Sequence, residues 1–123
     1  MAQRILIAED EPNIVISLEF LLTGAGYEVA VARDGATALL MVDQLRPDLV
    51  VLDLMLPSVN GFEVCRRIRD GRDSRDTKIL MLTARGRQSE VKRGMAAGAN
   101  AYITKPFATR DLVQTVAELL MQE

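Results

Sequence analysis

The sequence contains no histidine and only one cysteine, Cys65. Without histidine, the chain has no Ser-His-Asp or Cys-His nucleophile, no histidine-ligated zinc and no phosphohistidine of its own. A single cysteine excludes an intramolecular disulfide framework, and the place of Cys65 on the apolar face of a predicted helix indicates a core residue. Any chemistry of this protein must therefore come from carboxylates, hydroxyls and lysine.

Neither sign of charge is in large excess. Fifteen Lys and Arg residues stand against seventeen Asp and Glu residues, which leaves a net charge of −2. No overall charge attracts the chain to nucleic acid or to an anionic membrane surface, so we expect this domain to bind neither. The chain also lacks a long uncharged apolar stretch and a signal-peptide core. A cytoplasmic location is the simplest expectation.

The length and composition are those of one folded domain. Apolar residues make up 49% of the 123 residues and charged residues 26%. This composition excludes a disordered, a collagen-like or a coiled-coil chain. We therefore expect residues 1–123 to form a single domain with a hydrophobic core.

Short apolar runs alternate with longer segments of helical periodicity along the whole chain, without a linker between them. This alternation is typical of an α/β fold. Most of the runs are too apolar for a sheet with one face in water, which favours a parallel sheet covered on both faces. The run interrupted by Glu28 fits an edge strand better. The predicted strands are residues 4–8, 27–32, 49–52, 79–82 and 101–103.

Apolar residues at helical spacing predict five helices between and after these strands. The first begins at Pro12, the third follows Gly61, and the last begins near Thr109, which we expect to be its N-cap. The fourth helix, residues 87–97, has few large apolar side chains and Gly94 in its interior. We expect it to be the least firmly packed of the five.

Polar side chains follow four of the predicted strands directly. In an open parallel α/β sheet, ligands bind beyond the carboxyl ends of the strands, so we expect these side chains to share one site. They are Glu9, Asp10, Glu11, Asp53, Thr83 and Lys105, the last of which is followed by Pro106.

Carboxylates gathered in one crevice repel one another and need a cation, and oxygen ligands without histidine or cysteine suit Mg²⁺ or Mn²⁺. An Asp carboxylate can attack phosphorus, while a metal, a lysine and a hydroxyl stabilise the charge of the phosphoryl oxygens. Each residue also has a simpler interpretation by itself. Asp10 would be a helix N-cap, Thr83 a cap or turn hydroxyl, and Lys105 a solvated lysine.

Four segments of the chain, in their order and spacing, resemble the receiver domain of two-component response regulators, the CheY-like family. The resemblance covers essentially the whole chain. It implies a flavodoxin-like, doubly wound α/β domain, with a five-stranded parallel sheet of order 2-1-3-4-5 and five helices. The matching segments are ILIAEDE (5–11), DLVVLDLMLPSVNG (48–61), ILMLTAR (79–85) and GANAYITKPF (98–107).

The resemblance assigns roles to the strand-end residues. Asp53 would be the phospho-acceptor. The residues that would hold Mg²⁺, or Mn²⁺ in its place, are Glu9, Asp10, Asp53 and Met55, the last through its backbone carbonyl.

The resemblance also implies a switch. Lys105 would supply a cation to the phosphoryl group and precede a cis peptide bond to Pro106. Thr83 would move toward the phosphoryl group, and Tyr102 would then turn inward. We expect the output surface to be formed by the fourth helix, the fifth strand and the fifth helix.

The implied function is that of a signalling switch and not of a conventional enzyme. The domain would take a phosphoryl group from a phosphohistidine of a sensor histidine kinase or phosphotransfer protein, and would catalyse its own phosphorylation and slow dephosphorylation. Its other partners would be an output domain or target protein and a phosphorylation-dependent homodimer. Asn100 and Ala101, however, stand where the winged-helix branch usually has two acidic residues that help a paired dimer form. Met55 and Arg85 occupy positions that tune dephosphorylation.

Two other functions use similar residues. A small Mg²⁺-dependent phosphohydrolase with an Asp nucleophile would need a second Asp two residues further on, where this chain has Met55. An inert receiver would bind a partner without being phosphorylated, although every acceptor-site position is filled here. Arg66, Arg67 and Arg69 fit a solvated helix face.

Overall fold

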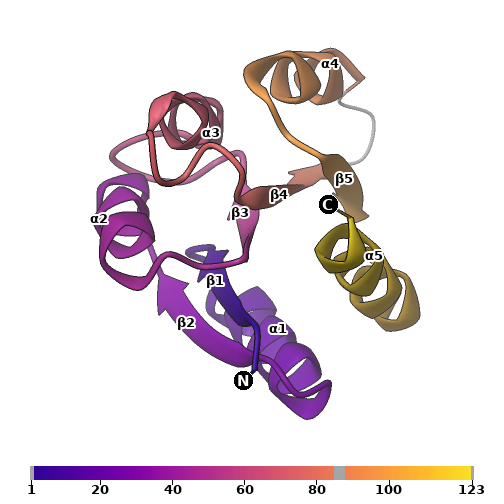
Figure 1. Cartoon of the computed structure of the whole chain (residues 1–123). Coiled ribbons are helices and arrows are strands. Elements are labelled where there is room, and N and C mark those ends of the chain that lie inside the picture. The colour runs from indigo at the N-terminus through magenta and orange to yellow at the C-terminus, as the bar shows by residue number, and fades with distance from the viewer. Residues whose placement is uncertain (1, 85–87, 123) are drawn as a thin grey trace.

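The computed structural model describes residues 2–84 and 88–122, in which five strands alternate with five helices (Figure 1). The strands form one parallel sheet of order β2-β1-β3-β4-β5, which confirms the expected doubly wound α/β fold. In chain order the elements are β1 (Arg4–Ala8), α1 (Pro12–Gly24), β2 (Glu28–Ala32), α2 (Gly35–Leu45), β3 (Leu49–Asp53), α3 (Gly61–Asp70), β4 (Lys78–Ala84), α4 (Gln88–Ala97), β5 (Ala101–Lys105) and α5 (Thr109–Met121).

The strands are buried in proportion to their apolar content. Every residue of β3 is buried, whereas β2 is mostly half-buried and lies at an edge, as its glutamate indicated. Three strand ends were predicted too short, and Asp53 is the last residue of β3 instead of the residue after it. Thr83 lies inside β4, and Lys105 is the last residue of β5, because both continue the ladder of backbone hydrogen bonds with their neighbours.

Alternate residues of the strands face two separate hydrophobic cores. Leu6 and Val50 belong to the core beneath α2 and α3, while Ile7 and Val51 belong to the core beneath α1 and α5. Figure 1 shows these helix pairs on opposite faces of the sheet. Each fully buried Leu or Ile contributes about 1.5–3 kcal/mol through removal of its surface from water, so the two cores stabilise the sheet that carries the polar strand ends.

The helices begin at different kinds of residue. Pro12 is the first residue of α1, as predicted. The N-cap of this helix is Glu11, whose side chain forms no capping hydrogen bond, so the interpretation of Asp10 as a cap is wrong. Thr109 is the first residue of α5 and not its N-cap, which is Ala108. The side chain of Asn60 caps α3 by accepting from the Glu63 N–H at 3.0 Å.

Helix α4 buries little of itself. Gly94 is its only fully buried residue among those described, and Met95 remains exposed. A Cβ on Gly94 would overlap the Sδ of Met81, so glycine allows α4 to lie close to β4. The Arg93 guanidinium also lies 4.1 Å from the centre of the Phe62 ring on α3. Residues 85–87, which include Arg85 and the predicted start of this helix, lie outside the described residues.

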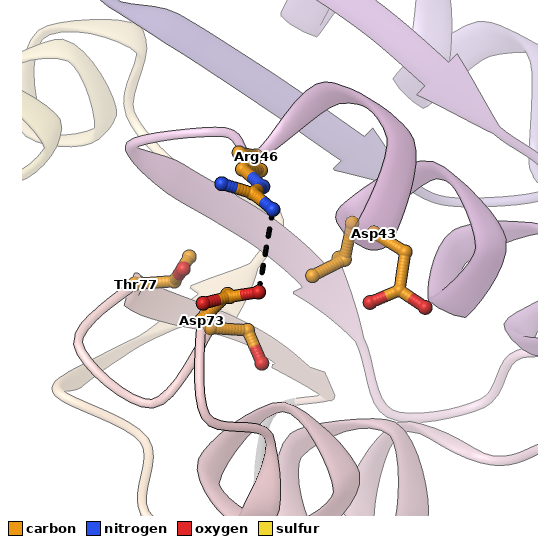
Figure 2. Close-up of a pocket in the computed structure, with 6 residues that line it drawn as sticks. Asp43, Arg46, Asp73 and Thr77 are labelled. Carbon is orange, nitrogen blue, oxygen red and sulfur yellow. Dashed lines mark hydrogen bonds and ion pairs between the residues drawn. The ribbon is translucent and has the colours of Figure 1, made fainter.

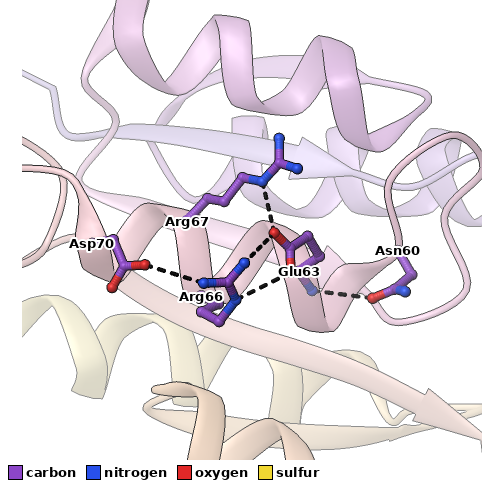
Figure 3. Close-up of polar contacts among 5 residues, drawn as sticks. All are labelled: Asn60, Glu63, Arg66, Arg67 and Asp70. Carbon is purple, nitrogen blue, oxygen red and sulfur yellow. Dashed lines mark hydrogen bonds and ion pairs between the residues drawn. The ribbon is translucent and has the colours of Figure 1, made fainter.

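Helix α3 has an exposed charged face, shown in Figure 3. Arg66 and Arg67 both bind Glu63 there, as expected of a solvated face. Arg69 does not belong to this face. Its guanidinium is half-buried and donates to the carbonyl of Gly98 at 2.8 Å and to Oδ1 of Asn100 at 2.7 Å.

Cys65 is buried in α3, as its position predicted. Burial raises the pKa of its thiol, and the nearby charge of Arg69 opposes this only in part. Among the described residues, no helix has the length and apolar character needed to cross a membrane.

Candidate functional site

The carboxyl ends of β1, β3 and β5 border one cleft of about 500 Å³. Parallel strands end at the same edge of a sheet, so residues far apart in sequence are brought together there. The residues that line the cleft include Glu9, Asp10, Asp53, Met55 and Lys105.

Three carboxylates form a cluster in this cleft. Oxygen atoms of Glu9, Asp10 and Asp53 all lie within 4.8 Å of one another. Glu9 and Asp53 are buried, while Asp10 is exposed. Hard oxygen ligands in this number suit a small divalent cation that keeps several waters, so the cluster fits Mg²⁺, and its donor chemistry also suits Mn²⁺.

Glu9 is held in place by the backbone that follows it. Its Oε2 accepts from the N–H groups of Asp10 at 3.0 Å and of Glu11 at 3.1 Å. Its Oε1 faces the Lys105 Nζ at 2.8 Å. Burial raises the pKa of Glu9, the Lys105 and Glu11 contacts lower it, and the charge of Asp53 raises it again, so that the net shift is upward.

Lys105 is the cation that faces this cluster. Its Nζ lies 3.4 Å from Oδ1 of Asp53 in addition to its contact with Glu9. Burial by itself lowers the pKa of Lys105, but the hydrogen bond with Glu9 and the two negative charges outweigh it, and the pKa is raised. The ammonium therefore stays charged at neutral pH. The peptide bond between Lys105 and Pro106 is cis.

Asp53 ends β3 at a point where the chain turns tightly. Its Oδ1 accepts from the Met55 N–H at 3.2 Å. The Gly61 N–H donates to the carbonyl of Leu54 at 3.0 Å. A Cβ on Gly61 would lie 2.6 Å from the carbonyl oxygen of Asp53, so only glycine allows this closure. The sequence pattern placed Gly61 just before the third helix and gave no sign of this contact beside Asp53.

Thr83 is buried in β4 one residue beyond Leu82, which pairs with Asp53. The cleft is lined by its neighbours Leu82 and Ala84 and not by Thr83 itself. In the part of the chain that the structure describes, no group forms a hydrogen bond with its Oγ1. A buried hydroxyl without a partner costs free energy, which rearrangement toward an acceptor would recover.

Tyr102 lies on the edge strand β5, outside the cleft. Its side chain is 45% exposed, and its strand partner is Met81. The structure therefore gathers Glu9, Asp10, Asp53, Met55 and Lys105, and it places Thr83 behind them and Tyr102 on the surface.

A second hollow, of about 260 Å³, lies beside the amino ends of β3 and β4 (Figure 2). Arg46 and Asp73 form an ion pair across it, with 3.3 Å between Nη2 and Oδ2. Both side chains are largely exposed, so water screens their attraction. This hollow lacks the buried charges of the strand-end cleft among the residues that line it.

Comparison with known proteins agrees with the geometry. Residues 5–117 match the response regulator receiver domain family. The DNA-binding response regulator MtrA of Mycolicibacterium smegmatis is 47% identical over 116 residues, which are 94% of this chain and 50% of MtrA. This chain thus spans about half the length of that relative.

Two solved structures share the fold closely. The chemotaxis response regulator CheY4 of Vibrio cholerae has a TM-score of 0.91 at 31% identity, covering 97% of this chain and 99% of CheY4. The second is the receiver domain of the sensor histidine kinase PA1611 from Pseudomonas aeruginosa, whose structure has magnesium coordinated in the active-site cleft. Its TM-score is 0.92 at 30% identity, and the match covers 99% of this chain and 100% of that receiver domain. By sequence, fold and acidic cluster alike, this chain belongs to the receiver domain family of two-component response regulators.

Proposed function

We propose that the chain is a phospho-accepting switch, in which Asp53 takes a phosphoryl group from a phosphohistidine of a sensor histidine kinase or phosphotransfer protein. The observation that supports this most directly is the site of Asp53, which is only 4% exposed, belongs to the acidic cluster and lies 3.4 Å from Lys105. We also propose that residues 1–123 act as one receiver unit.

The transfer requires a nucleophile and neutralisation of charge. A carboxylate oxygen of Asp53 forms the new bond to phosphorus while the bond from phosphorus to the histidine nitrogen breaks, and the nitrogen keeps the electron pair. Lys105 is already charged and placed to bind an oxygen of the transferred group. Glu9 holds Lys105 in this position through its own ion pair.

The metal ligands of this proposal are Glu9, Asp10, Asp53 and the Met55 carbonyl. When bound, Mg²⁺ or Mn²⁺ neutralises the carboxylates and the negative oxygens of the incoming group. Asp10 is the exposed member of the cluster, and Glu9 is oriented by backbone N–H groups. The backbone therefore fixes the orientation of the Glu9 carboxylate before a metal binds.

The switch follows from the phosphoryl oxygens, which are strong hydrogen-bond acceptors. Thr83 Oγ1 lacks a partner among the described residues and moves to donate to one of them. Tyr102 then turns from the surface into the space that Thr83 leaves. Both changes alter the surface formed by α4, β5 and α5, which we propose as the output surface.

The partners follow from this role. A sensor kinase supplies the phosphoryl group, and an output domain or target protein reads the altered surface, while the domain itself contacts no nucleic acid. The domain catalyses its own phosphorylation and its own slow dephosphorylation, and it has no other substrate. Phosphorylation promotes a homodimer. The two positions that are usually acidic in the winged-helix branch hold Asn100, which binds Arg69, and Ala101, which carries no charge, so this dimer lacks those acidic residues. The cytoplasm is the proposed location.

The intact mass after incubation with Mg²⁺ and a small acyl phosphate tests the proposal. We expect one phosphoryl group on the wild-type protein, stable in acid and lost in base, and none on Asp53→Asn. Asp43→Asn removes a carboxylate outside the cleft and should be modified like the wild type.

Other outcomes favour the alternatives. Rapid turnover of assorted phosphate esters would favour the phosphohydrolase. The exposed side chain of Met55 argues against that enzyme, because it occupies the position where the enzyme needs an Asp. A wild-type protein that neither binds Mg²⁺ nor gains a phosphoryl group would favour the inert receiver.

A further inference from the structure

The start of α2 is tied to the β3–α3 loop (residues 54–60) by a pair of side chains. Asp34 is the N-cap of α2, and its Oδ1 accepts from the Thr37 N–H at 2.7 Å. The same Oδ1 accepts from Oγ of Ser58 at 3.3 Å. Ser58 Oγ in turn accepts from the Ala36 N–H at 3.1 Å. Ser58 thus joins the loop to both the cap and the first turn of α2.

The backbones make a second connection at the same place. The Gly35 N–H donates to the carbonyl of Pro57 at 3.0 Å. A Cβ on Gly35 would overlap the carbonyl oxygen of Val59, so the loop and α2 approach each other as closely as glycine permits. Ser58 adopts a φ of 66°, in the left-handed region that costs energy for a serine. The contacts with α2 stabilise the loop in this conformation.

The loop also touches the candidate acceptor. The Met55 N–H donates to Oδ1 of Asp53 at 3.2 Å, so the loop backbone fixes one carboxylate oxygen. At its far end, Asn60 caps α3 (Figure 3), so a side-chain hydrogen bond anchors that end of the loop to the helix. A displacement at the middle of the loop therefore moves the N–H that orients Asp53.

We propose that Asp34 is a positioning residue for Asp53. Through Ser58 it holds the β3–α3 loop against α2, and the loop holds Met55 beside the carboxylate that takes the phosphoryl group. This role rests on the proposed function of Asp53 and adds to it a residue that lies outside the cleft.

The charge of Asp34 suits this task. The hydrogen bonds from the N–H and hydroxyl of Thr37 lower the pKa of Asp34, partial burial opposes them, and the bond from Ser58 lowers it further. The carboxylate is therefore ionised at neutral pH and acts only as an acceptor. Its two oxygens divide the work, because Oδ2 accepts from the Thr37 hydroxyl at 3.0 Å while Oδ1 serves the loop.

The test separates the tie to the loop from the cap of α2. Ser58→Gly removes both Oγ contacts, keeps the cap intact, and places glycine where the positive φ favours it. Thr37→Val is the matched control, since it removes the hydroxyl bond to Asp34 and leaves Ser58 in place. Asp34→Asn retains an acceptor for Ser58 and should rescue what Asp34→Ala loses.

Two readouts are needed, and neither depends on phosphorylation. Amide hydrogen exchange at Met55 and Gly61, without metal, reports whether the loop stays in place. An NMR titration with Mg²⁺ reports the consequence at the cleft. For Ser58→Gly and Asp34→Ala we expect faster exchange at both amides and roughly ten-fold weaker Mg²⁺ binding, as when groups behind metal ligands are lost. Thr37→Val should lower only the thermal stability.

The proposal is overturned by exchange rates in Ser58→Gly equal to those of the wild type. It is equally overturned if exchange rises but the Mg²⁺ affinity of Ser58→Gly and Asp34→Ala stays within two-fold of wild type. A wild-type protein without Mg²⁺ affinity would contradict the proposed function of the cleft instead, and the exchange rates would still decide whether Asp34 holds the loop.

Discussion

At the scale of single residues, the cluster of Glu9, Asp10 and Asp53 sets three negative charges beside the positive charge of Lys105. Lys105 forms ion pairs with Glu9 and Asp53, whereas Asp10 forms none with it in the part of the chain that the structure describes and adds repulsion at the exposed mouth of the cleft. Because the carboxylates repel one another, binding of a cation to this cluster stabilises the folded protein.

We expect Asp10→Asn to stabilise the metal-free protein. Two charges within 4.8 Å repel by roughly 1 kcal/mol where water screens them, and the amide removes this repulsion. The same change removes a metal ligand, so Mg²⁺ should stabilise the variant less than the wild type. Urea unfolding with and without Mg²⁺ measures both effects.

The control for Asp10→Asn is Asp43→Asn, an exposed carboxylate outside the cluster, which should change stability by less than about 0.5 kcal/mol in either condition. If the Asp10→Asn variant is less stable than the wild type without metal, repulsion does not dominate at this position.

Cys65 illustrates a buried ionisable group with no part in the site. Because burial raises the pKa of its thiol, the folded protein keeps the proton at a pH where the unfolded chain loses it. Stability attributed to this group is therefore complete below the unfolded pKa, near 9.0, and falls as the pH rises above it.

We expect iodoacetamide to modify Cys65 slowly in the folded protein and rapidly in urea, since the thiolate is the reactive form. Timed mass spectra at mildly alkaline pH give both rates. Equal rates in the two conditions would mean that the thiol is accessible in the native state.

At the scale of elements, α4 differs from the other helices because its buried residue, among those described, is Gly94, which lies against Met81. In an ordinary exposed helix, Gly to Ala gains about 1 kcal/mol through reduced backbone entropy. Here the added methyl would meet the side chain of Met81, which is itself buried.

We expect Gly94→Ala to destabilise the protein by about 1 kcal/mol, because overpacking of a filled core outweighs the helical preference of alanine. Met81→Leu shortens the opposing side chain and should recover part of the loss in the double variant. Thermal unfolding of the two single variants and the double variant gives the coupling. A stabilised Gly94→Ala would show that Met81 moves aside without cost.

At the scale of the whole molecule, Arg69 connects segments that are distant in sequence. From α3 its guanidinium reaches the turn that follows α4 through Gly98, the start of β5 through Asn100, and the α3–β4 connection through the carbonyl of Thr77. Asn100 Oδ1 also accepts from the Ile79 N–H at 2.7 Å. The arginine thus joins α3 to the segment before β4 and to the segment between α4 and β5.

We expect Arg69→Met to lower the free energy of unfolding by about 2 kcal/mol, since several half-buried acceptors lose a donor together. Arg66→Met and Arg67→Met are matched controls on the same helix. They remove surface ion pairs with Glu63 and, for Arg66, also the exposed pair with Asp70, and should cost less than about 1 kcal/mol each. Equal losses for all three arginines would contradict the special role of Arg69.

Much of the fold was predictable because it depends on local pattern. The apolar runs identified every strand of the sheet, and Glu28 identified an edge. The gathering of Asp10 and Asp53 followed from the rule that parallel strands end together. Strand ends were less predictable, because hydrogen bonds to a neighbouring strand carry Thr83 and Lys105 into the sheet in spite of their polarity.

The sequence by itself determined the fold class and the chemistry of the strand-end residues, because periodicity and residue type act locally, and its resemblance to the receiver family singled out Asp53 as the candidate acceptor. Only the tertiary structure decided that Arg69 is a half-buried link, that Asp10 is not a cap, and that Asp34 meets Ser58. The contacts of Arg69 and Asp34 join segments far apart in the chain, and their geometry exists only once the sheet has brought the segments together.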